Sequence, residues 1–162
     1  MKSRTIKNLL QITWLFTGVI WFTACNGNEP DADRQQILNI LKNERIAHLN
    51  KNSDLFIAEF ADSVYQISNG KVEYISKVQL KKHIVDYFNR SKIVKWDDLQ
   101  APVIRFSKDQ TMAYTIVKKL VVTEPGQSAS AVKKDTIIFS WVSIYGKSGG
   151  EWRLACNVST RN

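Results

Sequence analysis

Glu44 and His48 are the residues of this 162-residue chain whose types and spacing most suggest chemistry. They stand four positions apart in the segment LNILKNERIAHLN, so a helix would place them one turn apart on the same face. The other members of that face are apolar: Ile37, Ile40, Leu41 and Ala47. Titratable side chains seldom lie in an apolar stripe by accident, and this pair is therefore the first candidate site.

Two interpretations of the pair are open. Buried polar groups need hydrogen-bond partners, so Glu44 and His48 could be structural, bonding to each other, to the backbone or to a buried water. Alternatively, a carboxylate whose pKa is raised by burial beside an imidazole could act as a general base or orient a ligand. Asp62 is a weaker candidate acid, followed by Asp97 and Asp98, because aspartate at the end of an element commonly caps a helix or turn.

Aromatic residues could line an apolar pocket that offers a few polar groups, although such residues also serve as ordinary core. The candidates for a ligand pocket are Tyr65, Tyr87, Trp96, Tyr114 and Trp141. The sequence has no nucleophile-elbow, zinc-protease, P-loop or dinucleotide-binding motif, and its two histidines are far apart. We therefore expect no metal and no cofactor. Whether the chain is an enzyme is left open, and the lack of a catalytic signature favours a role without chemistry.

The elements that would position these residues begin with helices. An expected helix starts with Asp33 as N-cap and Gln36 three residues later, and runs to about Lys51. A short helix follows, then a small hairpin around Asn69-Gly70, then a third helix capped by Ser76. The expected ranges of these three are residues 55–62, 63–75 and 76–89.

The second half of the chain reads as antiparallel strands. Strands are expected at residues 103–106 and 112–122, followed by a hairpin over residues 135–160 with a tryptophan in each arm. Both faces of the first arm carry large apolar groups, so it needs cover on both sides. Alternation in the second arm places Trp152, Leu154, Cys156 and Val158 on one face, which makes Cys156 an inert core thiol.

The N-terminal residues resemble a bacterial lipoprotein leader. Three basic residues precede an apolar run from Leu9 to Phe22, which is too short to span a bilayer comfortably. The sequence Phe22-Thr23-Ala24-Cys25 resembles a lipobox, in which Cys25 is lipidated and becomes the new N-terminus. The expected organisation is a signal peptide at 1–24, the lipidated cysteine and tether at 25–32, and one domain at 33–162. Asn26 after the cysteine, by resemblance to such lipoproteins, favours the outer membrane.

The charge of the chain is mildly basic. Its formal net charge is +8, but Lys2, Arg4 and Lys7 belong to the leader. No arginine-rich run, zinc-ligand spacing or recognition-helix pattern is present, so we expect no nucleic-acid partner. The densest basic stretch, from Lys77 to Lys95, is interpreted either as a solvated face or as attraction to an anionic membrane or ligand.

The order of these elements, with three stretches of sequence, resembles the nuclear transport factor 2-like family, especially its SnoaL-like and ketosteroid-isomerase-like members. The stretches are Phe60-Ala61-Asp62-Ser63-Val64, Asn69-Gly70-Lys71 and Trp141-Val142 with Gly150-Glu151-Trp152-Arg153-Leu154. The resemblance implies an α+β fold in which a cone-shaped, curved antiparallel sheet, a cystatin-like roll, wraps around the N-terminal helices. It also implies a pocket inside the cone and a homodimer formed through the outer surface of the sheet. The catalytic positions of ketosteroid isomerase do not align convincingly with residues of this chain.

Three functions are consistent with this sequence. The leading hypothesis is a membrane-anchored envelope lipoprotein whose domain binds a small apolar molecule without chemistry. The first alternative is an isomerase, dehydratase or cyclase that uses Glu44 or His48. The second is an envelope protein that binds a partner protein through its sheet.

Overall fold

The computed structural model describes residues 30–125 and 134–161, which form three helices and seven strands. Cys25 and the rest of the predicted leader lie outside these residues. In chain order the elements are α1 (Pro30–Asn50), α2 (Ser53–Ala58), β1 (Phe60–Ser68), β2 (Lys71–Ser76), α3 (Lys77–Arg90), β3 (Ser91–Asp98), β4 (Val103–Phe106), β5 (Met112–Pro125), β6 (Asp135–Ser148) and β7 (Glu151–Arg161). None of the helices in the described ranges is both long enough and apolar enough to cross a membrane.

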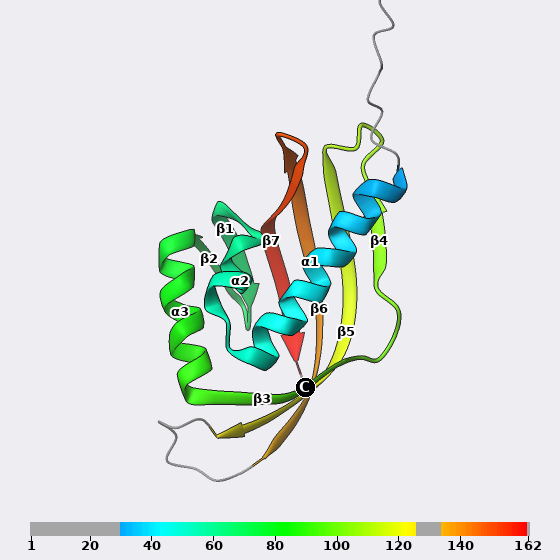
Figure 1. Ribbon diagram of the computed structural model, residues 1–162. Coiled ribbons are helices and arrows are strands. Elements are labelled where there is room, and N and C mark those ends of the chain that lie inside the picture. Colours follow the sequence, from blue (N-terminus) through cyan, green and yellow to red (C-terminus); the bar gives the residue numbers. More distant parts are fainter. Residues whose placement is uncertain (1–29, 126–133, 162) are drawn as a thin grey trace, which may run out of the picture.

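The strands form one curved sheet, and the helices lie on one side of it (Figure 1). The strand order is β2-β1-β7-β6-β5-β3, with β4 paired to β5 away from this path. Within the described residues every pairing is antiparallel except that of β1 with β7, which is parallel. The predicted α+β class is confirmed. The strand β3 was not predicted, and it extends the sheet beside β5, beneath the end of α1.

Local sequence signals account for most element boundaries. Asn69 and Gly70 have φ angles of 50° and 76°, as a tight two-residue hairpin turn requires, and they join β1 to β2. The predicted capping box is present, because Ser76 accepts a bond from the backbone N–H of Gln79 and the Gln79 side chain accepts one from the backbone N–H of Ser76. Asn52 caps α2 by accepting a hydrogen bond from the backbone N–H of Leu55 at 2.9 Å.

Asp33 has a different position from the one predicted. The helix α1 already begins at Pro30, so Asp33 lies in its first turn instead of capping it. Its side chain is buried, and both carboxylate oxygens accept hydrogen bonds of 2.8 Å from the Lys147 ammonium group near the end of β6. This buried ion pair fixes the start of α1 against the sheet.

The core lies between the helices and the concave face of the sheet. The predicted apolar stripe of α1 is confirmed, because Ile37, Ile40, Leu41 and Ala47 are all buried. One cluster of buried residues surrounds Trp152, Tyr145 and Val64, and a second surrounds Trp96 and Trp141. Both tryptophans of the β6–β7 hairpin therefore point toward the helices.

The strand β7 contains a β-bulge that changes its alternation. Ile144 pairs with Cys156 and Tyr145 pairs with Leu154, which leaves Ala155 as an extra residue. The predicted alternation is correct for Trp152 and Leu154 but wrong beyond the bulge, because one extra residue exchanges the two faces. Cys156 therefore lies on the outer face as a half-buried free thiol, not in the core, and burial raises its pKa.

Candidate functional site

A cavity of about 270 Å³ lies between the helices and the concave face of the sheet. It is mostly aromatic and apolar, with a small number of polar side chains, which is the usual composition of a small-molecule site. The residues that line it are Glu44, His48, Phe56, Phe60, Gln66, Tyr87, Trp96, Phe139, Trp141, Leu154, Asn157 and Ser159.

The helix α1 brings Glu44 and His48 to this cavity, one turn apart. The Nδ1 atom of His48 donates a hydrogen bond to the backbone carbonyl of Glu44 at 2.8 Å. This bond assigns the proton to Nδ1 and leaves Nε2 as an acceptor. One nitrogen of His48 therefore bonds to the backbone, as the structural interpretation expects. The side chains of Glu44 and His48 do not bond to each other.

The His48 ring is enclosed by aromatic side chains. It stacks on Trp96 with 3.9 Å between ring centroids and 16° between ring planes. Phe56 and Phe88 approach it edge-on, with centroids at 5.0 Å and 5.7 Å. Burial lowers the pKa of His48 from 6.5 to about 4, so the imidazole is neutral at physiological pH.

The pKa of Glu44 is shifted in the opposite direction. Burial raises the pKa of its carboxyl group from 4.5 to about 7, while the nearby Lys119 ammonium lowers it and Asp98 raises it. The residue is half-buried and lines the cavity. Its carboxyl group has no hydrogen-bond partner among the described residues. Near neutral pH this group can therefore either accept or donate a proton at the cavity.

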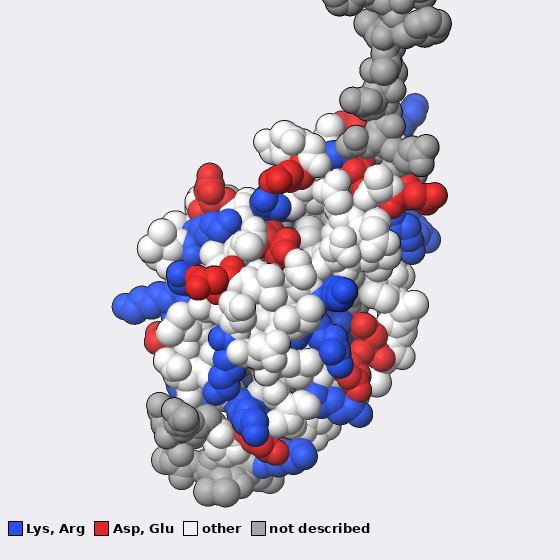
Figure 2. Space-filling model, viewed as in Figure 1, with Lys and Arg blue, Asp and Glu red and all other residues white. Residues whose placement is uncertain are grey.

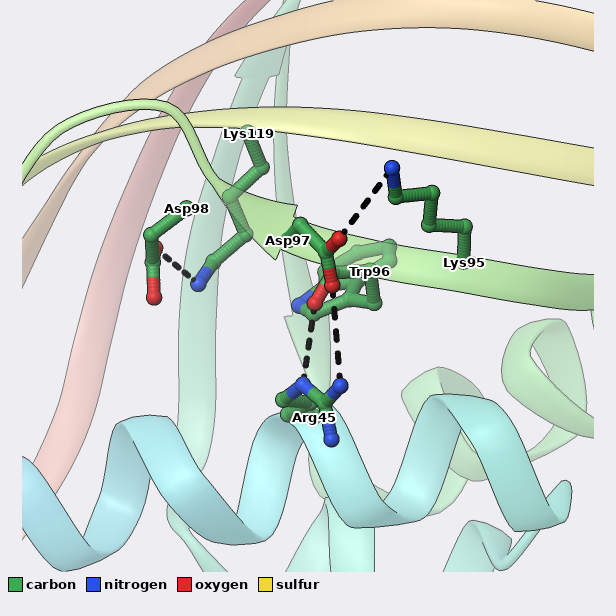
Figure 3. Close-up of polar contacts among 6 residues, drawn as sticks. All are labelled: Arg45, Lys95, Trp96, Asp97, Asp98 and Lys119. Atoms are coloured by element: carbon green, nitrogen blue, oxygen red, sulfur yellow. Dashed lines mark hydrogen bonds and ion pairs between the residues drawn. The ribbon is translucent and has the colours of Figure 1, made fainter.

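Lys119 is a buried charged residue that lowers the pKa of both Glu44 and His48. It projects from β5 toward α1 and is buried, and its ammonium group forms an ion pair with Asp98 of β3 (Figure 3). The same ammonium lies 5.9 Å from the centroid of the Trp141 ring. Asp98 satisfies the Lys119 charge, so Lys119 does not form an ion pair with Glu44.

A second set of polar contacts holds α1 on β3. The Arg45 Nε atom donates to the backbone carbonyl of Trp96 at 3.0 Å, and its guanidinium lies 3.6 Å from the Asp97 carboxylate. Lys95 approaches the same carboxylate at 3.3 Å (Figure 3). These contacts hold Trp96 where it stacks on His48. Asp97 and Asp98 thus have structural partners.

The structure divides the aromatic residues predicted for the pocket. Tyr87, Trp96 and Trp141 line the cavity, and burial raises the pKa of Tyr87 to about 12, so its phenol is neutral. Tyr65 and Tyr114 lie instead on the outer face of the sheet, where 49% and 42% of their surfaces are exposed. Successive residues of a strand face opposite sides of the sheet, and in β5 the neighbours of Tyr114 face inward: Ala113, Thr115 and Val117 are buried.

Asp62 does not contribute to this cavity. The second helix ends at Ala58, so Asp62 lies on strand β1 and not at a helix end. Its side chain is exposed, and it is not among the residues that line the cavity.

Several cavity residues were not predicted. Asn157 and Ser159 reach it only because of the bulge at Ala155, and nothing in the sequence marks that bulge. Lys119, which is buried but does not line the cavity, was also not predicted; it was detectable, because it has the same parity in β5 as Val117 and Val121, both fully buried.

The metal-ligating side chains and the charges of the helical face are spread over the described residues. No three histidine, cysteine, aspartate or glutamate side chains of the described ranges are close enough together to hold a metal ion. On the helical face of the molecule, lysine and arginine side chains are interspersed with aspartate and glutamate (Figure 2). That pattern is typical of a solvated surface and not of a nucleic-acid footprint.

No protein-family model matches the sequence, and no curated protein sequence matches it either. Comparison of structures does find matches. A nuclear transport factor 2-like superfamily protein from Salmonella enterica superposes with a TM-score of 0.68 at 12% identity, over 80% of this chain and 91% of that one. The chain has the nuclear transport factor 2-like fold. The resemblance predicted from the three sequence stretches is thereby confirmed at the level of architecture.

Two further proteins of known structure share the nuclear transport factor 2-like fold with this chain. One from Streptomyces avermitilis, named as a candidate dehydratase, has a TM-score of 0.64 at 11% identity, over 80% of this chain and 97% of that one. One from Pseudomonas putida, named as a candidate polyketide cyclase, has a TM-score of 0.53 at 12% identity, over 76% of this chain and 89% of that one. At these identities the shared property is the fold.

Proposed function

We propose that this chain is a lipid-anchored protein of the bacterial cell envelope whose domain binds a small, largely apolar molecule. The observation that carries the proposal is the cavity, about 270 Å³ in volume and walled mainly by aromatic rings. The carboxyl group of Glu44 lines this cavity and has no hydrogen-bond partner among the described residues. A ligand that bonds to this group would remove the cost of leaving it unsatisfied.

Ligand-induced changes in melting temperature test this function. We would measure the melting temperature of the purified chain, of Glu44→Gln and of His48→Ala with a panel of ring compounds. Glu73→Gln is a matched control, because Glu73 is an exposed glutamate on β2. Variants that melt like the parent but lose a ligand-induced shift support the site. Large losses of stability in both variants, with no ligand shifting the parent, would show that the pair is only structural.

Proton transfer is a second candidate function, and the pKa of about 7 for Glu44 favours it. The Glu44 carboxylate could remove a proton from a carbon beside a carbonyl group and return it to a neighbouring atom. His48, held neutral, could accept a hydrogen bond from the same ligand. The names of the Streptomyces and Pseudomonas proteins indicate the reaction classes to try first, dehydration and cyclisation.

Isotope exchange would test proton transfer directly. Cyclic ketones incubated with the chain in deuterated water should exchange the hydrogen next to the carbonyl group, which NMR detects. Exchange should be lost in Glu44→Gln and retained in the Glu73→Gln control. A ketone that binds in the cavity without exchanging would count against an enzyme of this kind.

The lipid anchor is supported by the leader and by the lipobox-like sequence that ends at Cys25. Metabolic labelling with palmitate should mark the chain and should fail in Cys25→Ala. Labelling that persists in that variant would refute the anchor. In a bacterium with two membranes, fractionation should place the chain in the outer membrane, and Asn26→Asp should retain it in the inner membrane.

A homodimer through the outer face of the sheet is part of the same proposal. The helices cover only the concave face (Figure 1), while the outer face exposes Tyr65, Tyr114, Ile116 and Val158. A groove there, lined by residues that include Met112, Val142 and Ile144, is almost entirely apolar. A two-fold axis would place this face against its own copy. Retention of a different envelope protein by a monomeric chain would favour the interaction-module alternative.

A further inference from the structure

A second, polar recess adjoins the cavity at the end of the sheet. It has a volume of about 220 Å³ and is lined by Ser68, Asn69, Phe139, Ser159, Thr160 and Arg161. Phe139 and Ser159 line both spaces, so the recess and the aromatic cavity share a wall. A ligand seated in the cavity can therefore extend a substituent into the recess.

Arg161 gives this recess its charge. Beyond the bulge, alternate residues of β7 face the concave side, so Arg161 has the same orientation as Asn157 and Ser159. Its main chain pairs with Phe139. The lining of the recess contains no carboxylate, and Arg161 forms no ion pair within the described ranges. A guanidinium group in this position can bind a carboxylate through two parallel hydrogen bonds.

The part of the cavity outside the recess has the opposite preference. Glu44, Tyr87 and the neutral ring of His48 line the cavity but not the recess, and Lys119 forms its ion pair with Asp98. A carboxylate placed beside Glu44 would be repelled whenever Glu44 is ionised. A neutral hydroxyl group could instead donate to Nε2 of His48, and a carbonyl group could accept from protonated Glu44.

The volume of the cavity limits the ring system. Pockets for drug-sized ligands span about 300–1,000 Å³, and this cavity, at about 270 Å³, lies just below that range. This volume favours one or two rings over a four-ring sterol skeleton. The recess offers separate space for the substituent that reaches Arg161.

We propose that the ligand is a one- or two-ring organic acid whose carboxylate binds Arg161 in the recess and whose neutral hydroxyl or carbonyl group contacts Glu44 and His48 in the cavity. This inference rests on the proposed function, because it requires the cavity to be a binding site. It adds the chemical class of the ligand and the direction in which the ligand lies.

A hydroxynaphthoic acid with its two groups at opposite ends of the ring system is a suitable probe. Its primary amide lacks the charge, and the corresponding naphthoic acid lacks the hydroxyl group. Quenching of Trp96 and Trp141 fluorescence reports binding, since both rings line the cavity. Because Arg161 is exposed and solvent screens its charge, the acid should bind the parent chain about threefold to fivefold more tightly than the amide.

Arg161→Gln should remove this preference while leaving the affinity for the amide unchanged. Arg105→Gln is the matched control, because Arg105 is an exposed arginine on β4, outside the recess, and this variant should retain the preference. In the parent, the naphthoic acid without the hydroxyl group should bind more weakly than the hydroxynaphthoic acid.

The outcomes separate the two proposals. If the acid and the amide bind the parent equally well, or if Arg161→Gln retains the preference, the acid subsite is refuted and the cavity remains a binding site. If none of the three probes binds, and no compound of the wider ring panel shifts the melting temperature, then the proposed function fails together with this inference.

Discussion

The two titratable residues of α1 should make opposite contributions to the pH dependence of stability. The pKa of Glu44 is raised from 4.5 to about 7, so the folded state holds a proton that the unfolded state releases. Stability from this group is full below pH 4.5 and falls as the pH rises toward 7. The pKa of His48 is lowered from 6.5 to about 4, so its contribution is full above pH 6.5 and falls as the pH decreases.

The two effects overlap and should nearly cancel in the parent chain. One pKa unit corresponds to about 1.4 kcal/mol, and both groups are shifted across the window from pH 4.5 to 6.5. In that window the Glu44 slope is negative and the His48 slope is positive, with about the same size. Replacing either residue by glutamine should expose the slope of the other, with a total change of about 3 kcal/mol in the free energy of unfolding.

Denaturant unfolding at the two ends and the middle of this window would measure the effect in the parent, Glu44→Gln, His48→Gln and the double variant. Relative to the parent, Glu44→Gln should gain stability as the pH rises, and His48→Gln should gain stability as the pH falls. The double variant should follow the parent. Other ionisable groups contribute equally to all four chains, so the differences isolate this pair. If the difference in unfolding free energy between Glu44→Gln and the parent does not vary with pH, then Glu44 titrates like a solvated carboxyl group. That result would refute the argument from burial.

Three further predictions follow from the ion pairs and the outer face. Asp98→Asn should lower the pKa of Glu44, because it removes a nearby negative charge and frees the ammonium group of Lys119. Titration of the Glu44 carboxyl carbon by NMR would measure this pKa, and an unchanged value would contradict the prediction. Lys147→Met should lower the free energy of unfolding by about 3–5 kcal/mol, as denaturant unfolding measures it, because it leaves Asp33 as a buried unpaired charge. The double variant Lys147→Met, Asp33→Leu should recover much of that loss. Equal losses in the single and the double variant would argue against the pair. Ile116→Lys should convert the proposed dimer into a monomer, as judged by light scattering at micromolar concentration; a parent chain that is itself monomeric would refute the dimer.

Most of the fold could be predicted because its signals are local. Capping residues, the Asn69-Gly70 turn and the apolar periodicity of α1 and α3 each depend on a few neighbouring residues. The strand β3 escaped prediction, since Ser91–Asp98 is charged along its exposed positions and buries only Ile93 and Trp96 fully. A strand of that composition is recognisable only once its neighbour β5 is in place.

The site was predictable to the extent that it lies on a helix. The position of Glu44 and His48 in an apolar stripe follows from a period of 3.6 residues, and the structure places both at the cavity. The contribution of the sheet was harder to predict, because parity decides whether a strand residue faces inward. Tyr114 and Lys119 lie on one strand with opposite parity, and only the lysine faces the core.

The bulge at Ala155 has a consequence for how ligand preference could change in related chains. If Ala155 entered the regular ladder and the bulge were lost, simple alternation would turn Cys156 and Val158 toward the cavity and Asn157 and Ser159 outward. The lining would then lose two polar groups without any amino-acid substitution. Gain or loss of a one-residue bulge in the final strand is therefore a route by which this architecture can exchange a polar cavity lining for an apolar one.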